Sequence, residues 1–141
     1  MPSSEACLLD TNILFRIAKR DDPQYPAIVN ALRALASQDI RLCYTSQTLG
    51  EFWNASTRPL EKNGFGLSVS EADRLARVIE NTFEFLPDSR ELHARWRALL
   101  VAHDVKGVHV HDARLAASMY VHGVRRILTI TDNQCPRFPP L

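Results

Sequence analysis

Short apolar runs alternate with longer stretches of helical periodicity along this chain. Apolar runs predict strands over residues 6–9, 41–44, 84–86 and 125–130. Between them, apolar side chains recur at helical spacing and predict helices over residues 12–19, 24–37, 46–57, 68–83, 88–103 and 111–122. Strands that alternate with helices favour parallel βαβ units, with helices on both faces of one sheet. We therefore expect an α/β fold.

Residues at the ends of these segments support the assignment. Ser46 is a suitable N-cap for the third helix, and the pattern Ser-Val-Ser-Glu over residues 68–71 is a capping box. Residues 88–91 repeat that pattern with Asp88 as the cap. Gly123 follows the last helix, where a left-handed residue is expected. Residues 59–67 contain two glycines and a proline, which predicts a mobile loop.

Length and composition favour one compact domain over residues 1–141. The 141 residues are 45% hydrophobic, and the net charge of +1 excludes a global attraction to nucleic acid. The three cysteines are far apart and odd in number, which indicates reduced thiols in a cytoplasmic protein. We find no signal peptide pattern and no apolar run of membrane length. Any binding to nucleic acid must therefore come from a local group of basic side chains that contact phosphate. The candidates are Arg58, Lys62, Arg114, Arg125, Arg126 and Arg137.

Three acidic residues stand at informative positions. Asp10 ends the first apolar run, so it lies either at the carboxyl end of a strand, where ligands bind, or simply caps the next helix. Asp112 opens the last helix on the same face as Leu115 and Met119, which predicts an inward side chain. Asp132 also follows a strand-like run. Glu51, by contrast, lies off the apolar stripe of its helix, and periodicity alone predicts a solvated glutamate.

Four segments together resemble the PIN-domain ribonucleases. Residues 8–12, Leu-Leu-Asp-Thr-Asn, resemble the opening motif of that family, and residues 46–59 resemble its second motif, with Glu51 at the position of the glutamate. Residues 110–117 are similar to the third motif, with Asp112 at the position of the aspartate. Residues 126–129 and 137–139 resemble the last strand and tail. Each motif is weak alone, but all four in order are specific, and VapC-like toxins of toxin–antitoxin pairs are the most similar members.

The resemblance implies a three-layer α/β/α sandwich with a central parallel sheet. It implies that Asp10, Glu51 and Asp112 meet in one acidic pocket, and it overrides the prediction from periodicity for Glu51. It further implies an RNA substrate, a cognate antitoxin partner and a homodimer. Residues 59–67 and the neighbouring apolar helices are the expected contact surfaces.

The chain departs from the family near its end, where the family pattern is Thr-x-Asn-x-x-Asp-Phe. Thr129 is kept, but Thr131, Gln134 and Cys135 occupy the positions of the asparagine, aspartate and phenylalanine. The usual fourth acid is therefore missing. Asp132 lies two residues early, and we expect it to be a minor contributor or an outer one.

The chemistry implied by this set of residues is that of a metal-dependent endoribonuclease. Crowded carboxylates need a cation or raised pKa values to offset their repulsion, and an all-oxygen site favours Mg²⁺ or Mn²⁺. We assign Asp10 and Asp112 as principal ligands and Glu51 as the group that orients the attacking water. Thr11, Asn12 and Thr129 are expected to hydrogen-bond the carboxylates.

Several alternatives stay open at this point. His109 and His111 flank the pocket, but residues two apart need not face one ion, so a structural role is favoured. Trp53 and Trp96 fit apolar stripes and are expected in the core. The missing acid also motivates a catalytically silent PIN domain that binds RNA or protein. A dehalogenase-type phosphatase is disfavoured, because Asn12 occupies the position of its second aspartate.

Overall fold

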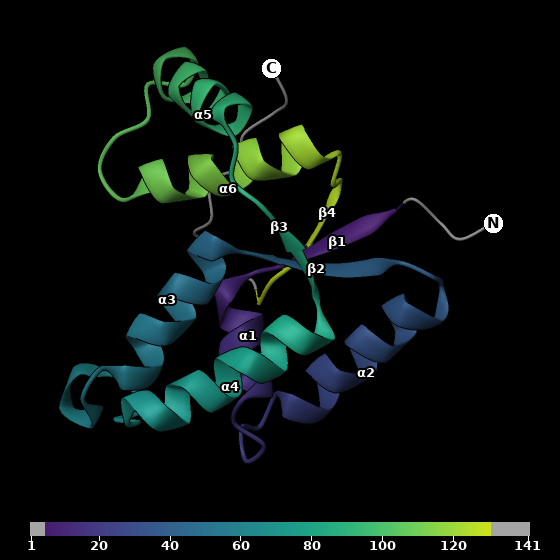
Figure 1. Ribbon diagram of the computed structural model, residues 1–141, viewed down its shortest axis with the longest axis vertical. Coiled ribbons are helices and arrows are strands. Elements are labelled where there is room, and N and C mark those ends of the chain that lie inside the picture. The colour runs from purple at the N-terminus through teal and green to yellow at the C-terminus, as the bar shows by residue number, and fades with distance from the viewer. Residues whose placement is uncertain (1–4, 131–141) are drawn as a thin grey trace.

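The computed structural model describes residues 5–130, and its elements follow the predicted alternation of strands and helices (Figure 1). In chain order they are β1 (Ala6–Leu9), α1 (Thr11–Ile17), α2 (Tyr25–Ser37), β2 (Arg41–Thr45), α3 (Ser46–Thr57), the short 3-10 helix η1 (Leu60–Lys62), α4 (Val69–Thr82), β3 (Glu84–Leu86), α5 (Arg90–Ala102), α6 (His109–His122) and β4 (Arg126–Leu128).

The strands form one parallel sheet in the order β3-β2-β1-β4. Leu8 of β1 lies opposite Cys43 of β2 on one side and Ile127 of β4 on the other. Because all strands run in the same direction, their carboxyl ends lie along one edge of the sheet. Asp10, Thr45 and Thr129 are the last or following residues of three of these strands.

Helices cover both faces of the sheet, which makes the predicted α/β/α sandwich. On one face, Leu9 and Tyr44 pack with Ile13, Phe52 and Ile79, which belong to α1, α3 and α4. On the other face, the alternate side chains pack against α6, in a cluster of Ala6, Leu8, Cys43, Leu86, Leu115 and Val124. Helix α5 packs on α6, farther from the sheet (Figure 1). Side chains of β1 point alternately to the two faces, so all four of its residues are buried.

Several element ends differ from the sequence predictions. Thr45, and not Ser46, caps α3, and its hydroxyl accepts from Thr48 N at 3.1 Å. Ser89, and not Asp88, caps α5. Helix α6 begins at His109, two residues before the predicted start, and β4 is limited to residues 126–128. The predicted capping box of Ser68 and Glu71 is present, and Gly123 adopts the expected left-handed conformation with a φ of 67°.

The loop predicted as mobile is fastened to α3. Phe65 N donates to Ala55 O at 3.1 Å, and Leu67 N donates to Ser56 O at 2.9 Å. Gly64 is pressed against the backbone of Arg58, where a Cβ atom would lie 1.9 Å from the carbonyl oxygen. In residues 5–130, no helix is long and apolar enough to cross a membrane.

A candidate acidic site at the carboxyl edge of the sheet

Asp10 caps α1 and also lies at the carboxyl end of a strand, the two positions considered from the sequence. It is the N-cap of α1, and its Oδ1 accepts from Thr11 N at 2.8 Å. Its Oδ2 accepts from Thr129 Oγ1 at 2.9 Å, and its own N–H donates to Leu128 O at 3.0 Å. The half-buried carboxylate is thus held between β1 and β4, at the edge where ligands bind in open parallel sheets.

Glu51 lies beside Asp10 because both carboxylates bind the same threonine. Thr11 gives its backbone N–H to Asp10, and its hydroxyl donates to Glu51 Oε2 at 2.6 Å. Glu51 Oε1 accepts from Gln47 Nε2 at 3.1 Å. The solvated position that periodicity predicts for Glu51 is wrong, since α1 packs against α3 and leaves this side chain half-buried.

Asn12 fastens the end of β4 to the start of α1. Its Nδ2 donates to Ile130 O and to Thr129 Oγ1, each at 3.1 Å, and its Oδ1 accepts from Ile130 N at 3.2 Å. This pairing keeps Thr129 within reach of Asp10. Thr11 and Thr129 thus each donate to a carboxylate, whereas Asn12, for which the same contact was predicted, binds Thr129 and the backbone of Ile130 instead.

Asp112 lies in the first turn of α6 and is less buried than predicted. Its side chain is 38% exposed, whereas the buried face of α6 consists of Ala113, Leu115, Ala117 and Ser118. Its Oδ2 lies 3.5 Å from His109 Nδ1. No hydrogen bond joins Asp112 directly to Asp10 or Glu51. Among residues 5–130, no three His, Cys, Asp or Glu side chains lie close enough together to hold a metal ion.

In residues 5–130, the three candidate acids have no Lys or Arg partner. Within the described part of the chain, neither Lys nor Arg forms an ion pair with Asp10, Glu51 or Asp112. Their hydrogen-bond donors are neutral hydroxyl, amide and backbone groups, apart from His109. Uncompensated carboxylates at one edge, with oxygen atoms as the available ligands, match the preferences of a hard divalent cation.

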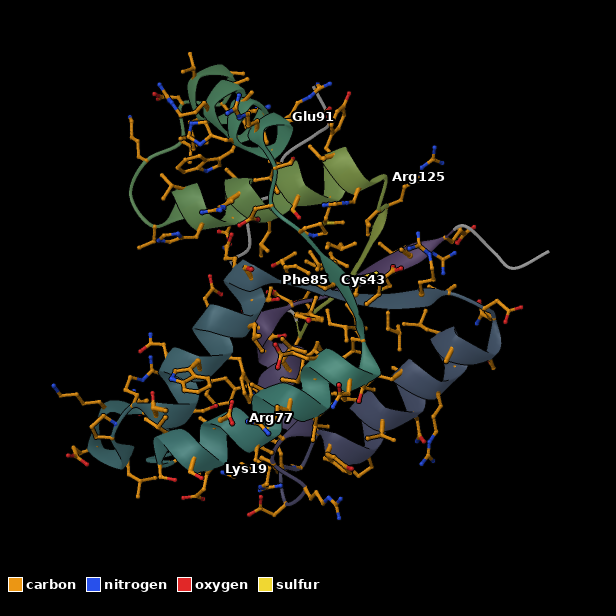
Figure 2. The ribbon with its side chains drawn as sticks, viewed as in Figure 1. Lys19, Cys43, Arg77, Phe85, Glu91 and Arg125 are labelled. Atoms are coloured by element: carbon orange, nitrogen blue, oxygen red, sulfur yellow. The ribbon has the colours of Figure 1, made fainter. Side chains whose placement is uncertain are left out.

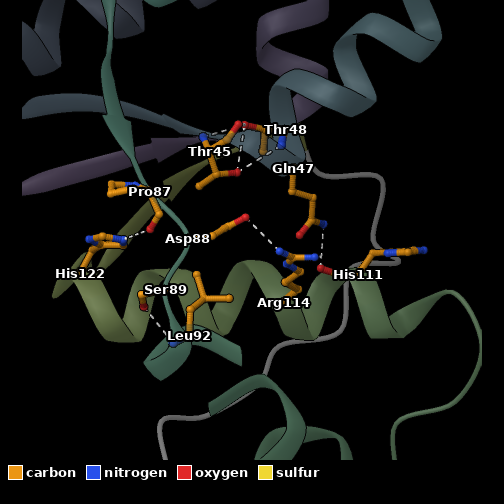
Figure 3. Close-up of polar contacts among 10 residues, drawn as sticks. All are labelled: Thr45, Gln47, Thr48, Pro87, Asp88, Ser89, Leu92, His111, Arg114 and His122. Atoms are coloured by element: carbon orange, nitrogen blue, oxygen red, sulfur yellow. Dashed lines mark hydrogen bonds and ion pairs between the residues drawn. The ribbon is translucent and has the colours of Figure 1, made fainter. Parts of the chain in front are cut away.

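Asp88 is an acid at the same edge that the sequence interpretation assigned to capping. It follows β3, and its Oδ2 accepts from Arg114 Nη2 of α6 at 3.0 Å (Figure 3). This ion pair compensates its charge, so Asp88 differs from Asp10, Glu51 and Asp112, which have no Lys or Arg partner among the described residues. The short strand immediately before Asp88 is the signal in the sequence that points to this position.

The remaining candidates are mostly engaged elsewhere. Arg114 binds Asp88, Arg126 binds Glu5, and Arg58 donates to Asn63 O, whereas Arg125 extends outward beyond α6 (Figure 2). Trp96 packs against the α5–α6 cluster, which agrees with the predicted core role, and Trp53 is half-buried. The candidates Asp132, Gln134, Cys135 and Arg137 lie outside the described residues.

Two thiols lie inside the sheet, away from the acidic edge. Cys7 and Cys43 are free and buried in adjacent strands, and Figure 2 shows Cys43 near the middle of the molecule. Burial, with the neighbouring Glu84 carboxylate, raises the pKa of Cys43 to about 12. Burial also raises the pKa of Cys7. Such thiols stay protonated at neutral pH, which suits core packing and not catalysis.

Comparisons with known proteins agree on one family and one fold. The sequence model of the PIN domain family matches residues 7–139. VapC20 of Mycobacterium tuberculosis, described as a sarcin–ricin loop cleaving toxin, is 18% identical with a TM-score of 0.66, covering 90% of this chain and 91% of its own. VapBC2 of Rickettsia felis, bound to a promoter DNA fragment, is 16% identical with a TM-score of 0.69 (95% and 93% covered). FitAcB of Neisseria gonorrhoeae is 22% identical with a TM-score of 0.53 (84% and 83% covered). No curated protein matches by sequence.

Proposed function

This chain belongs to the PIN domain family, and from that premise we propose that it is a metal-dependent endoribonuclease that hydrolyses RNA phosphodiester bonds. The observation that carries the proposal is the pairing of Asp10 with Glu51 through Thr11, at the carboxyl edge of the sheet, without a basic partner among the described residues. Such a pair repels an RNA phosphate on its own and needs a cation to approach one. The family and the uncompensated charge thus support the same chemistry.

Asp10 and Asp112 are the proposed principal ligands of Mg²⁺ or Mn²⁺. Asp10 has one carboxylate oxygen on Thr129 and one on Thr11 N, which fixes its direction while leaving further lone pairs for a cation. Asp112 lies in the first turn of α6, where Gln47 of α3 binds the adjacent carbonyl of His111 at 2.9 Å, and this contact supports its assignment to the same site. A bound divalent cation would neutralise charge on the phosphodiester and acidify a water molecule.

Glu51 is the proposed group that orients the attacking water. Thr11 donates to one of its oxygens and Gln47 to the other, so the carboxylate cannot rotate freely. Its fixed lone pairs can accept a proton from a water molecule held in line with the phosphorus. Thr11 and Thr129 each hold one carboxylate in place, which is the usual role of outer groups at such sites.

The biological role that we propose is the toxin of a toxin–antitoxin pair. VapC20 is a toxin that cleaves the sarcin–ricin loop, and VapBC2 was solved as a complex on promoter DNA. Both cover nearly all of this chain, so we propose a cognate antitoxin as partner and a homodimer as the working assembly. The free thiols of Cys7 and Cys43 support a reducing compartment, the cytoplasm.

Cleavage of a structured RNA in the presence of Mg²⁺ or Mn²⁺ tests the activity. We expect the wild-type protein to cleave a synthetic RNA hairpin only when the cation is added, and Asp10→Asn and Asp112→Asn to abolish cleavage. Asp132→Asn should be milder, and Gln134→Asp should tighten metal binding by restoring a charge. Equal losses in Asp132→Asn and Asp112→Asn would instead identify Asp132 as the displaced fourth acid.

A catalytically silent PIN domain that binds RNA or protein is the second candidate. Two observations favour it. Within residues 5–130, no three His, Cys, Asp or Glu side chains lie close enough to hold a metal ion, and Gln134 stands at the position of the usual acid. A protein that binds the RNA hairpin but leaves it intact at every Mg²⁺ and Mn²⁺ concentration would establish this candidate. The match to the PIN family over residues 7–139 argues against the dehalogenase-type phosphatase.

A further inference from the structure

The turn of α6 that bears Asp112 has no cap of its own. Val108 is the N-cap residue, and no side-chain cap hydrogen bond is formed there. Apart from His109 at 3.5 Å, no described residue has a hydrogen bond or ion pair with the Asp112 carboxylate. Uncapped helix ends fray, so the position of Asp112 depends on contacts made by other elements.

Two donors from other helices bind this turn. Trp96 Nε1 of α5 donates to Val110 O at 2.8 Å, and Gln47 Nε2 of α3 donates to His111 O at 2.9 Å. Figure 3 shows Gln47 reaching from α3 toward His111 on α6. These two carbonyls directly precede Asp112 in the chain. Because α3 and α6 lie on opposite faces of the sheet, the Gln47 bond joins the two helical layers (Figure 1).

Gln47 also holds Glu51, one turn later on α3. The same Nε2 atom donates to Glu51 Oε1 at 3.1 Å, so both amide hydrogens are used. The reversed amide orientation would place Oε1 against two acceptors and is therefore excluded. Gln47 Oε1 is buried with no hydrogen-bond partner in the described structure, so the bonds of Nε2 set the position of this side chain.

We propose that Gln47 is a positioning residue that sets the separation of Glu51 from Asp112. It binds the carboxylate of the first and the backbone next to the second, and so ties the two helices that carry them. This inference rests on the proposed function, because the separation matters only if both acids serve one reaction. Metal ligands typically depend on such outer partners for their orientation.

The first test needs neither metal nor substrate. Gln47→Met keeps the length of the side chain but removes both N–H groups. We expect amide hydrogen exchange at residues 109–113 to become about fivefold faster, as for the loss of one neutral hydrogen bond, with residues 119–122 unchanged. Gln38→Met, at the exposed end of α2, is the matched control. Unchanged exchange at residues 109–113 in both Gln47→Met and Gln47→Ala would overturn the inference.

The second test measures Mn²⁺ affinity and RNA cleavage in the same variants. We expect Gln47→Met to lose roughly tenfold to a hundredfold in Mn²⁺ affinity, with kcat reduced more than KM is raised. Trp96→Phe, which loosens the same turn but leaves Glu51 bound to Gln47, should lose less. Faster exchange with unchanged Mn²⁺ affinity and kcat would overturn the positioning role. If the wild-type protein neither binds Mn²⁺ nor cleaves RNA, the proposed function fails, and the exchange result alone decides whether Gln47 ties the helices.

Discussion

Thr11 is the residue on which the arrangement of the acids depends most directly. One backbone N–H and one hydroxyl, a few ångströms apart on the same residue, bind Asp10 and Glu51. The backbone bond survives a substitution such as Thr11→Val, whereas the hydroxyl bond does not. Thr11 therefore allows the position of Glu51 to be perturbed without removing a carboxylate.

Thr11→Val should reduce RNA cleavage by roughly tenfold to a hundredfold while costing about 1 kcal/mol of stability. Valine keeps the shape of the side chain but leaves Glu51 Oε2 without its donor. Initial rates at saturating RNA and urea unfolding measure the two effects. Thr57→Val removes a hydroxyl that donates to Trp53 O at the far end of α3, and it should leave cleavage unchanged. A Thr11→Val enzyme as active as this control would contradict the proposed role of Glu51.

The substitution Asp112→Asn tests whether Asp112 is a metal ligand or a structural residue. Binding of Mg²⁺ or Mn²⁺ to the folded state should stabilise the wild-type protein by roughly 2.7 kcal/mol at a hundredfold excess over Kd. Asp112→Asn should abolish the resulting rise in Tm and leave the Tm of the metal-free protein nearly unchanged. Calorimetry with and without the cation measures both. A variant that is already unfolded without metal would show that Asp112 has a structural role.

At the scale of elements, α6 ends in a residue whose conformation demands glycine. Gly123 has a φ of 67°, and no atom lies within 4 Å of the place a Cβ would occupy. Gly123→Ala should therefore cost roughly 1 kcal/mol through the backbone alone. Gly50 lies inside α3 with equally open space but with helical backbone angles. Gly50→Ala should therefore raise the stability by roughly 0.5–1 kcal/mol. Urea unfolding of the two variants checks the sign of each effect, and equal effects would contradict the assigned backbone conformations.

Titration of the Cys43 thiol in β2 makes the stability of the protein depend on pH. The pKa of Cys43 rises from 9.0 to about 12 because of burial and the Glu84 carboxylate, so the folded protein holds the proton that the unfolded chain releases. The stabilisation is full below pH 9 and is lost as pH rises toward 12, by at most about 1.4 kcal/mol per unit. Cys43→Ser should show a smaller loss of stability between pH 9 and 11 in urea unfolding. Parallel curves for the two proteins would refute this account.

At the scale of the whole molecule, the parallel sheet explains why distant residues meet. Asp10, Glu51 and Thr129 follow three different strands, yet their strands end at the same edge. Glu51 of α3 is bound there by Thr11, and Gln47 of α3 binds the carbonyl of His111, the residue before Asp112, on the helix that covers the opposite face (Figure 1). The acidic site is thus a consequence of topology and not of any local motif.

Assembly is the remaining property of the whole molecule that can be tested. We expect a homodimer, on the basis of the resemblance to VapC-like toxins, with residues 59–67 near the contact. Sedimentation velocity at tens of micromolar should show the dimer mass, since association in this range requires only weak affinity. A single monomeric species under those conditions would contradict the proposed dimer.

Much of the fold was predictable because the patterns involved are local. The apolar runs of residues 6–9 and 41–44 and the capping box at Ser68 report backbone preferences that tertiary contacts did not change. The helix ends were less predictable. Asp88 satisfies a capping pattern, but Arg114, 26 residues away, takes its carboxylate, and Ser89 becomes the cap. Competition by a distant side chain is invisible to a local pattern.

The sequence by itself indicated the family and the alternation of strands and helices, and through the family resemblance it pointed to Asp10, Glu51 and Asp112 as candidate acids. Periodicity placed Glu51 in solvent, and only the tertiary structure explains why it is half-buried beside Asp10, because α1 packs on α3. It also placed Gln47 and Trp96 on the carbonyls of His111 and Val110, next to Asp112. Hydrogen bonds between side chains far apart in the sequence form only after the sheet has brought their elements together, so neither spacing nor periodicity encodes them.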